Sequence, residues 1–419
     1  MDSEGVLNKI RVLSACILSF AVMMLSGCSD SSDPDEAQLT VISNGTSVTA
    51  DMTVGEETTS SIDDEIPSDR LVIPDYMETK YASLEYDTRH TDVYNDVVTA
   101  MSGFEDSMYM PLTISATEFV DVLETVRCEQ LWLISISDRQ IGEFSSEEQT
   151  FEMDFTYKYS IRDTNIMLSE VEKVGDEIFE SIDENMTDYE KLKIFHDWLV
   201  LNCETSTVAP YADTIYGAMV AGEALCEGYA KAFSYLCNRA GIENMIVTGY
   251  TDVDHMWNMV KLDDGCWYHV DVSWDKPDDT LAELYPDIVL YQYFLVDDDV
   301  IKNNRTISTR FCEPPTADSN NYSYFVAENR YASTYDEALE IIEESCRECM
   351  DAGEKYFMLK LDSSNLYLQT TEWLKKADEN GISDIDRIAA DINFVGQISY
   401  IDYYKAHRVI IFVLEKSGG

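Results

Sequence analysis

A β-hairpin pattern in the middle of the chain constrains the fold more than any other feature. Residues 255–274 read HMWNMVKLDDGCWYHVDVSW, which is two alternating segments around a turn at residues 263–265. A three-residue loop that ends in a left-handed glycine is a common hairpin connection. This loop would place Trp257 opposite Asp271. His255 would then share a face with Asp271 as a diagonal neighbour, within reach across the two strands.

A cysteine lies where a loop is predicted to become a helix. Residues 222–233 read GEALCEGYAKAF, and the helix-forming stretch at residues 225–239 is followed by a terminating Gly241. Cys226 stands at the start of this helix, where the helix dipole stabilises a thiolate. The alternative is that this cysteine packs as a small hydrophobic residue.

These three residues suit thiol catalysis if the helix packs against the hairpin. A thiolate at Cys226 would be the nucleophile, and His255 would exchange protons with it and with the leaving amine. Asp271 would fix the tautomer of His255 and stabilise its charged form. The backbone N–H of Cys226 is a candidate oxyanion donor, while Gly222 and Gly228 would let backbone or substrate approach closely.

The same motifs resemble those of the bacterial transglutaminase-like superfamily. The similarity is specific over residues 189–277, where GEALCEGYAKAF and DHMWNMVKLDDGCWYHVDVSWD occur. It implies a papain-like α+β core, a cysteine-bearing helix packed on an antiparallel sheet, with Cys226, His255 and Asp271 at the triad positions. Aromatic side chains donate to the oxyanion in some members, and Tyr216 is the candidate here. The positions that match flanking motifs are Glu227, Gly228, Trp257, Asn258, Trp267 and Trp274.

The resemblance implies an enzyme that acts on amide bonds of proteins or peptides. It would be a cysteine protease, an amidase or an acyltransferase, working through an acyl-enzyme intermediate and without a cofactor. Hydrolysis is expected rather than crosslinking, because bacterial relatives are more often proteases or amidases. The alternative is a non-catalytic binding module at the cell surface that uses the same scaffold.

Two small α/β domains are predicted to flank this core. The core is expected at residues 176–312, and the flanking domains at residues 86–175 and 313–419. In the first of these domains, residues 130–136 (QLWLISI) and 151–161 alternate like strands. The predicted fold class is therefore α+β, with a papain-like core flanked by two small α/β domains.

The N-terminus is predicted to be an export and anchoring signal. Basic residues precede an apolar run at residues 12–24, which is too short for a spanning helix. The next four residues, LSGC, resemble the lipobox of bacterial lipoproteins and make Cys28 the expected lipidation site. Residues 1–27 would be a signal peptide, and the acidic segment at residues 28–85 would be a flexible tether. The protein is thus expected outside the cytoplasm, lipid-anchored to the bacterial cell membrane.

A formal net charge of -51 restricts the partners. A chain this negative is repelled by nucleic acid and by anionic membrane surfaces. The expected partners are a protein or peptide substrate, the cell wall, and the membrane only through the N-terminal lipid.

The other cysteines and histidines are predicted to be structural. Cys237 has no histidine or aspartate motif of its own, and Cys346 and Cys349 lie one turn apart on a predicted helix. His196 is expected to be a capped or half-buried packing residue, and the three tryptophans of the flanking motifs are expected in the core. His269 can share the face of the triad aspartate, so a Cys/His/His/Asp metal site is an alternative that the spacing does not favour.

Overall fold

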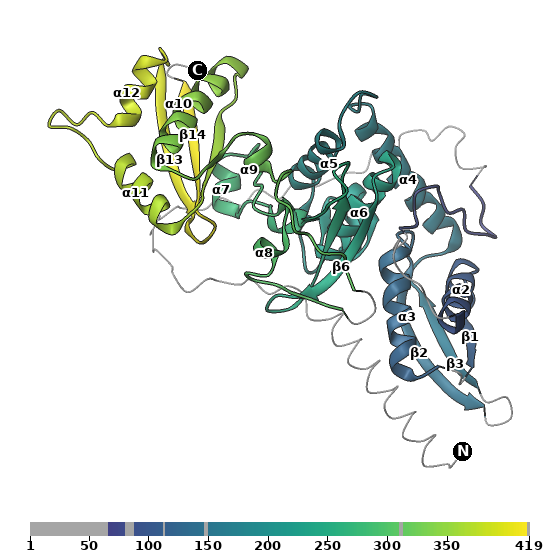
Figure 1. Cartoon of the computed structure of the whole chain (residues 1–419). Coiled ribbons are helices and arrows are strands. Elements are labelled where there is room, and N and C mark those ends of the chain that lie inside the picture. Colours follow the sequence, from purple (N-terminus) through teal and green to yellow (C-terminus); the bar gives the residue numbers. More distant parts are fainter. Residues whose placement is uncertain (1–65, 80–87, 112–113, 146–149, 310–312, 417–419) are drawn as a thin grey trace, which may run out of the picture.

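The computed structural model describes five stretches of the chain, which form three units in a row (Figure 1). The described stretches are residues 66–79, 88–111, 114–145, 150–309 and 313–416. The predicted signal peptide and Cys28 lie outside them. Within these stretches, no helix has both the length and the apolar character to cross a membrane.

The N-terminal unit combines two helices with an antiparallel sheet of strand order β1-β3-β2. Helix α3 begins with a capping box, in which Ser115 and Glu118 exchange hydrogen bonds. The strand predicted at residues 130–136 is wrong, because Trp132 is buried in a turn and the strand begins only at Ile136. The elements are α2 (Thr88–Ser102), β1 (Ser107–Pro111), α3 (Ala116–Glu129), β2 (Ile136–Ser145), β3 (Thr150–Tyr157) and the connecting helix α4 (Ile161–Phe179).

The central unit packs two helices on a five-stranded antiparallel sheet of order β10-β6-β7-β8-β9. Helix α6 begins at Cys226 and ends at the left-handed Gly241, with φ of 73°, as predicted. This arrangement confirms the expected α+β core. The elements are α5 (Asp188–Asn202), β4 (Glu204–Thr205), the π-helical turn η1 (Gly217–Ala221), β5 (Glu223–Ala224), α6 (Cys226–Ala240), β6 (Asn244–Tyr250), β7 (Asp254–Lys261), β8 (Trp267–Val270), the 3-10 turn η2 (Val272–Trp274), α7 (Asp279–Leu284), β9 (Phe294–Val296), α8 (Asp298–Ile301) and β10 (Thr306–Ile307).

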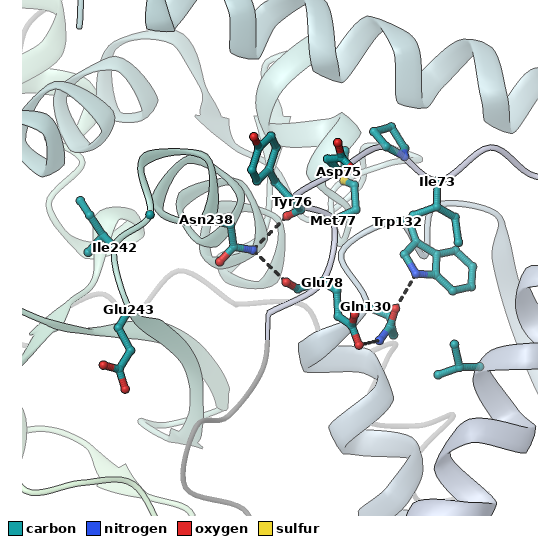
Figure 2. Close-up of a pocket in the computed structure, with 13 residues that line it drawn as sticks. Ile73, Asp75, Tyr76, Met77, Glu78, Gln130, Trp132, Asn238, Ile242 and Glu243 are labelled. Atoms are coloured by element: carbon teal, nitrogen blue, oxygen red, sulfur yellow. Dashed lines mark hydrogen bonds between the residues drawn. The ribbon is translucent and has the colours of Figure 1, made fainter. Parts of the chain in front are cut away.

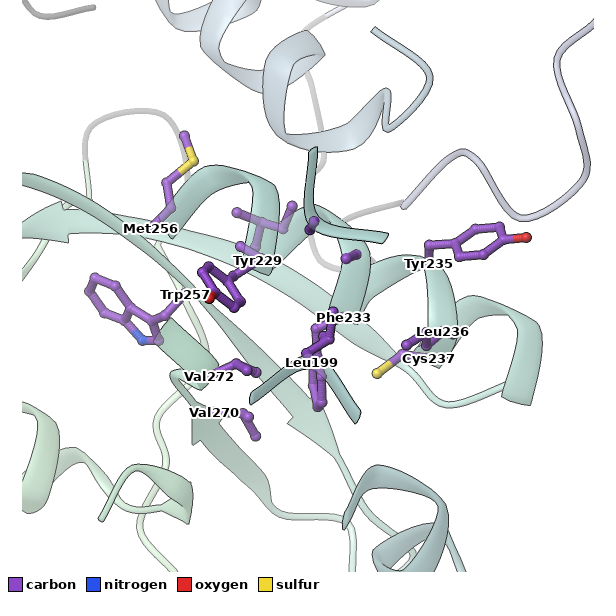
Figure 3. Packing of buried hydrophobic residues seen from close by; sticks show 14 of the residues in the cluster. Leu199, Tyr229, Phe233, Tyr235, Leu236, Cys237, Met256, Trp257, Val270 and Val272 are labelled. Atoms are coloured by element: carbon purple, nitrogen blue, oxygen red, sulfur yellow. The ribbon is translucent and has the colours of Figure 1, made fainter. Parts of the chain in front are cut away.

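Helix α6 runs through the interior of the central unit. Every residue from 227 to 237 is buried. Figure 3 shows Tyr229 and Phe233 in the same hydrophobic cluster as Leu199 of α5 and Trp257 of β7. Burying an apolar side chain of this size stabilises a fold by about 1.5–3 kcal/mol. Because the helix is held along its length, its first turn is held as well.

Residues 66–79 pack against the body of the protein, although they were expected to belong to the flexible tether. Asn165 of α4 accepts a hydrogen bond from the backbone of Val72 at 2.8 Å and donates to two carbonyls of the segment. Asn238 of α6 likewise donates to two backbone carbonyls (Figure 2). Met77 is buried. The tether prediction is therefore wrong for this stretch, because two asparagines supply the partners that its backbone needs.

The C-terminal unit has a four-stranded sheet of order β11-β12-β14-β13, with helices beside it. Cys346 and Cys349 of α10 are buried free thiols, as expected of structural residues. The unit meets the central one where His407 Nε2 and the Tyr293 hydroxyl lie 3.2 Å apart. The elements are α9 (Tyr324–Ala327), β11 (Tyr331–Ala332), α10 (Tyr335–Ala352), β12 (Tyr356–Leu361), α11 (Ser364–Leu374), α12 (Asp384–Asp391), β13 (Gly396–Tyr404), the 3-10 turn η3 (Lys405–His407) and β14 (Val409–Lys416).

Candidate active site

The hairpin of β7 and β8 brings His255 and Asp271 together. Asn258 pairs with Val270, which is the predicted register. His255 Nε2 lies 2.7 Å from Asp271 Oδ2, and both side chains are almost completely buried. The other carboxylate oxygen of Asp271 accepts a hydrogen bond from the hydroxyl of Ser273 at 2.8 Å. Because each oxygen has its own partner, the carboxylate is fixed in its orientation toward the imidazole.

A buried arginine that the sequence motifs do not indicate completes this pair. Arg305 approaches Asp271 Oδ2 through Nη2 at 2.6 Å and Nε at 3.2 Å. Its guanidinium carbon lies 4.2 Å from the ring centre of Trp274 and 4.0 Å from that of Tyr293. Burial alone would raise the pKa of the Asp271 carboxyl. The charges of His255 and Arg305 outweigh that effect and hold this pKa well below its usual range.

Cys226 occupies the first position of α6, half-buried and not in a disulfide. The N-cap residue Leu225 supplies no side-chain hydrogen bond to the first turn. Backbone N–H groups at a helix start favour an anion nearby, and a thiolate or an oxyanion would be that anion here. The N–H of Cys226 thus remains the backbone candidate for the oxyanion donor.

Shared neighbours place the start of α6 and the start of β7 at the same end of the central unit. Arg127 Nε lies 3.3 Å from an oxygen of Glu227, which follows Cys226 in the chain. Arg127 Nη2 lies 3.5 Å from the sulfur of Met256, which follows His255. One guanidinium thus touches the residue next to the predicted nucleophile and the residue next to the predicted base.

The matched tryptophan and asparagine of β7 hold the site in place. Asn258 donates to the carbonyl of Ala230 at 3.0 Å and so fastens α6 to the sheet. The ring of Trp257 is stacked on His255 at 5.8 Å and is buried, as predicted. The rings of Trp267 and Trp274 are only partly buried, and Trp274 meets His255 edge-on at 5.7 Å.

Gly228 lets a loop backbone pass close to the first turn of α6. A Cβ added there would lie 2.5 Å from the carbonyl oxygen of Ala212 and 2.9 Å from that of Thr214. We expect Gly228→Ala to destabilise the protein by about 1–3 kcal/mol, since neither backbone oxygen can swing away as a side chain would. Chemical unfolding of the two proteins measures this difference, and an unchanged midpoint would show that the loop yields freely.

Tyr216 does not direct its hydroxyl toward a reacting group in this structure. It stands just before η1 and donates to Glu170 Oε2 of α4 at 3.0 Å. Burial, followed by this hydrogen bond, raises the pKa of Tyr216 to about 12. Its one hydroxyl proton is therefore already committed, which counts against its predicted role as the side-chain oxyanion donor.

Both ring nitrogens of the buried His269 are in use. Trp257 Nε1 donates to Nδ1 at 3.0 Å, and Nε2 lies 2.9 Å from Asp298 Oδ1. Burial lowers the pKa of His269 by more than the carboxylate raises it, so the ring is held neutral. A metal role would require breaking these bonds. Among the described residues, no group of three or more histidine, cysteine or carboxylate side chains is arranged to hold a metal ion.

His196 is completely buried, whereas a half-buried packing residue was expected. Its nitrogens lie 3.1 Å from Asp197 and 3.1 Å from Asp275. Burial lowers the pKa of His196, but the two carboxylates more than reverse this and leave it raised. His196 thus joins α5 to Asp275, which follows η2. Asp275 also accepts the backbone N–H of Tyr293 at 3.0 Å, so the cluster reaches the segment before β9 as well.

Four buried thiols in the described parts of the central and C-terminal units are held protonated. Burial raises the pKa of Cys203 to about 11 and that of Cys237 well above its usual value. Burial likewise raises the pKa of Cys346 and of Cys349 to about 12. These thiols are therefore a background of low reactivity against which an activated cysteine would stand out.

Residues 176–272 match the model of the transglutaminase-like superfamily. The human kyphoscoliosis peptidase is 33% identical over 84 residues, which make up 17% of this chain and 13% of that protein. Two solved structures align with 33% of the chain. One is a candidate cysteine protease from Cytophaga hutchinsonii, with 17% identity, a TM-score of 0.23 and 65% of its own chain covered. The other is a candidate protease from Parabacteroides distasonis, with 12% identity, a TM-score of 0.20 and 39% covered. This chain thus spans less than two thirds of each.

Proposed function

Since residues 176–272 form a transglutaminase-like domain of a thiol-enzyme superfamily, we propose that this protein cleaves or transfers amide bonds of proteins or peptides. The observation that carries the proposal is the buried His255–Asp271 pair at 2.7 Å. It lies at the end of the sheet where the helix bearing Cys226 begins. A histidine oriented by a carboxylate beside a cysteine at a helix N-terminus is the arrangement that activates a thiol.

The proposed reaction proceeds through a thioester. Because Asp271 occupies Nε2 of His255, Nδ1 is the nitrogen that exchanges a proton with Cys226. The thiolate attacks the amide carbon, and the oxygen becomes an oxyanion beside the N–H groups of the first turn of α6. The C–N bond then breaks, and His255 gives its proton to the departing amine. Water, deprotonated by His255, cleaves the thioester to release an acid and restore the thiol.

We place hydrolysis ahead of transfer to an amine as the outcome. The two reactions share every step up to the thioester and differ only in the acceptor. We also propose that the enzyme works outside the cytoplasm, anchored by lipid at Cys28. This proposal rests on the apolar run and the LSGC motif near the N-terminus.

The proposed nucleophile is tested by competition among the cysteines. The full-length protein is treated briefly with iodoacetamide between pH 5 and 8, and each cysteine peptide is quantified by mass spectrometry. We expect Cys226 to be modified first at low pH, ahead of Cys203 and Cys266, whose thiols have raised pKa values. Cys226→Ala should remove the early label, and Cys237→Ala should leave it intact.

Equal rates for Cys226 and Cys203 across this pH range would overturn the proposal. The triad would then be dormant, and the domain would be better explained as a binding module at the cell surface.

A further inference from the structure

Helix α3 of the N-terminal unit carries a charged side chain to the edge of the candidate active site. Arg127 lies in the last turn of α3, and its side chain is 19% exposed. It lies 3.3 Å from Glu227 of α6, 3.5 Å from the sulfur of Met256 of β7 and 3.5 Å from Glu124 of its own helix. A residue from one folding unit therefore joins the two elements that bear the proposed nucleophile and base in another.

The charges around this contact are paired and mostly shielded from water. Glu227 is also bound by Lys231 at 2.8 Å, and the side chain of Lys231 is 3% exposed. Burial lowers the pKa of Arg127, but Glu124 and Glu227, followed by the thiols of Cys128 and Cys226, more than reverse this effect. The guanidinium is therefore a permanent positive charge, and the thiol of Cys226 is among the groups whose ionised form would favour it.

A positive charge at this place has a defined effect on a thiol. An opposite charge within about 4–6 Å favours the ionised form of a group, and a cation beside a cysteine lowers its pKa. Glu227 acts in the opposite direction, because its negative charge would disfavour a thiolate on the neighbouring residue. Arg127 and Lys231 neutralise that carboxylate where it adjoins the nucleophile. The other titratable or charged groups at this site are His255 of β7, with Asp271 and Arg305 behind it, and Glu124 and Cys128 of α3.

We propose that Arg127 is a positioning residue through which the N-terminal unit holds the start of α6 against the start of β7 and favours the thiolate of Cys226. The inference rests on the proposed function, since it concerns the same thiol. The N-terminal unit would thus help to assemble the active site, in addition to any contact that it makes with a substrate.

The test follows the pH dependence of iodoacetamide labelling at Cys226 in the full-length protein. Arg127→Met removes the charge and keeps an apolar side chain. It should lower the labelling rate of Cys226 at pH 6 about tenfold and move the inflection of the rate–pH curve to higher pH. Arg127→Lys should recover much of the rate. Glu227→Gln should move the inflection to lower pH, because it removes the opposing charge. Purely structural damage would slow labelling in both Arg127→Met and Glu227→Gln.

Arg239→Met is the matched control. Arg239 also joins α6 to a neighbouring helix, through Asp176 of α4 at 2.6 Å. It lies 13 residues beyond Cys226, which is about 20 Å along the helix. The pH profile of Cys226 labelling in Arg239→Met should coincide with that of the unaltered protein. An Arg127→Met profile that also coincides, or an equal shift in Arg239→Met, would overturn the inference. Slow labelling of Cys226 in the unaltered protein would instead overturn the proposed function.

Discussion

Arg305→Met is expected to destabilise the protein by about 3–5 kcal/mol, since it leaves a buried carboxylate without its cationic partner. Arg305 and Asp271 are 3% and 1% exposed, so water cannot take over the lost interaction. Methionine fills part of the space between the two aromatic rings but supplies no charge. The measurement is the free energy of unfolding from a urea titration monitored by tryptophan fluorescence.

The same substitution should change stability in acid. The pKa of Asp271 is lower in the folded protein than the value of about 3.9 expected of an unfolded chain. The unfolded chain therefore binds more protons in this acid range, and the stability that Asp271 contributes is present above pH 4 and lost as the pH falls. Without Arg305 the pKa of Asp271 moves back toward its usual value, so the midpoint of acid unfolding should move to higher pH.

A surface arginine provides the control for both measurements. Arg347 pairs with Glu343 one turn earlier on α10, and both side chains are about half exposed. Exposed pairs of this kind contribute about 0.3–0.5 kcal/mol. Arg347→Met should thus leave the urea and acid midpoints nearly unchanged. A loss in Arg305→Met no larger than this would show that the buried pair contributes nothing net to stability.

The sequence predicted the candidate site where local chemistry determined the geometry. The three-residue turn fixed the register of β7 and β8, and the register alone placed His255 beside Asp271. Gly241 likewise marked the end of α6, and the predicted bounds, residues 225–239, lie one residue from those observed. In each case the decisive signal lay within a few residues of the element that it defines.

The remaining parts of the site depend on contacts between distant segments. Arg305 follows Asp271 by 34 residues and reaches it only because β10 returns along the other edge of the sheet. Arg127 comes from another folding unit and belongs to no motif. The ordered segment at residues 66–79 was missed for the same reason, since its partners Asn165 and Asn238 lie far along the chain. Neither the amino-acid composition nor a local sequence pattern indicates these long-range contacts.

His255→Ala is expected to slow the labelling of Cys226 at pH 6 by about 100-fold, the largest effect on reactivity that the site predicts. An ordinary thiol has a pKa of about 8.5, so only about 0.3% of it is thiolate at pH 6. A cysteine paired with an imidazolium is mostly thiolate at this pH. Removing the imidazole returns Cys226 toward the ordinary fraction, although the helix N-terminus and Arg127 remain to favour the anion.

Asp271→Asn should give an intermediate result, because it keeps the imidazole and removes the charge that stabilises its protonated form. A single nearby charge shifts a pKa by about one unit or more, so the rate at pH 6 should fall by about tenfold, which is less than the fall in His255→Ala. His196→Asn is the control, since it alters a buried histidine–aspartate cluster that does not include Asp271. Equal rates in His255→Ala and the unaltered protein would mean that the buried pair serves the fold alone. Cys226 would then owe any reactivity to the helix and Arg127.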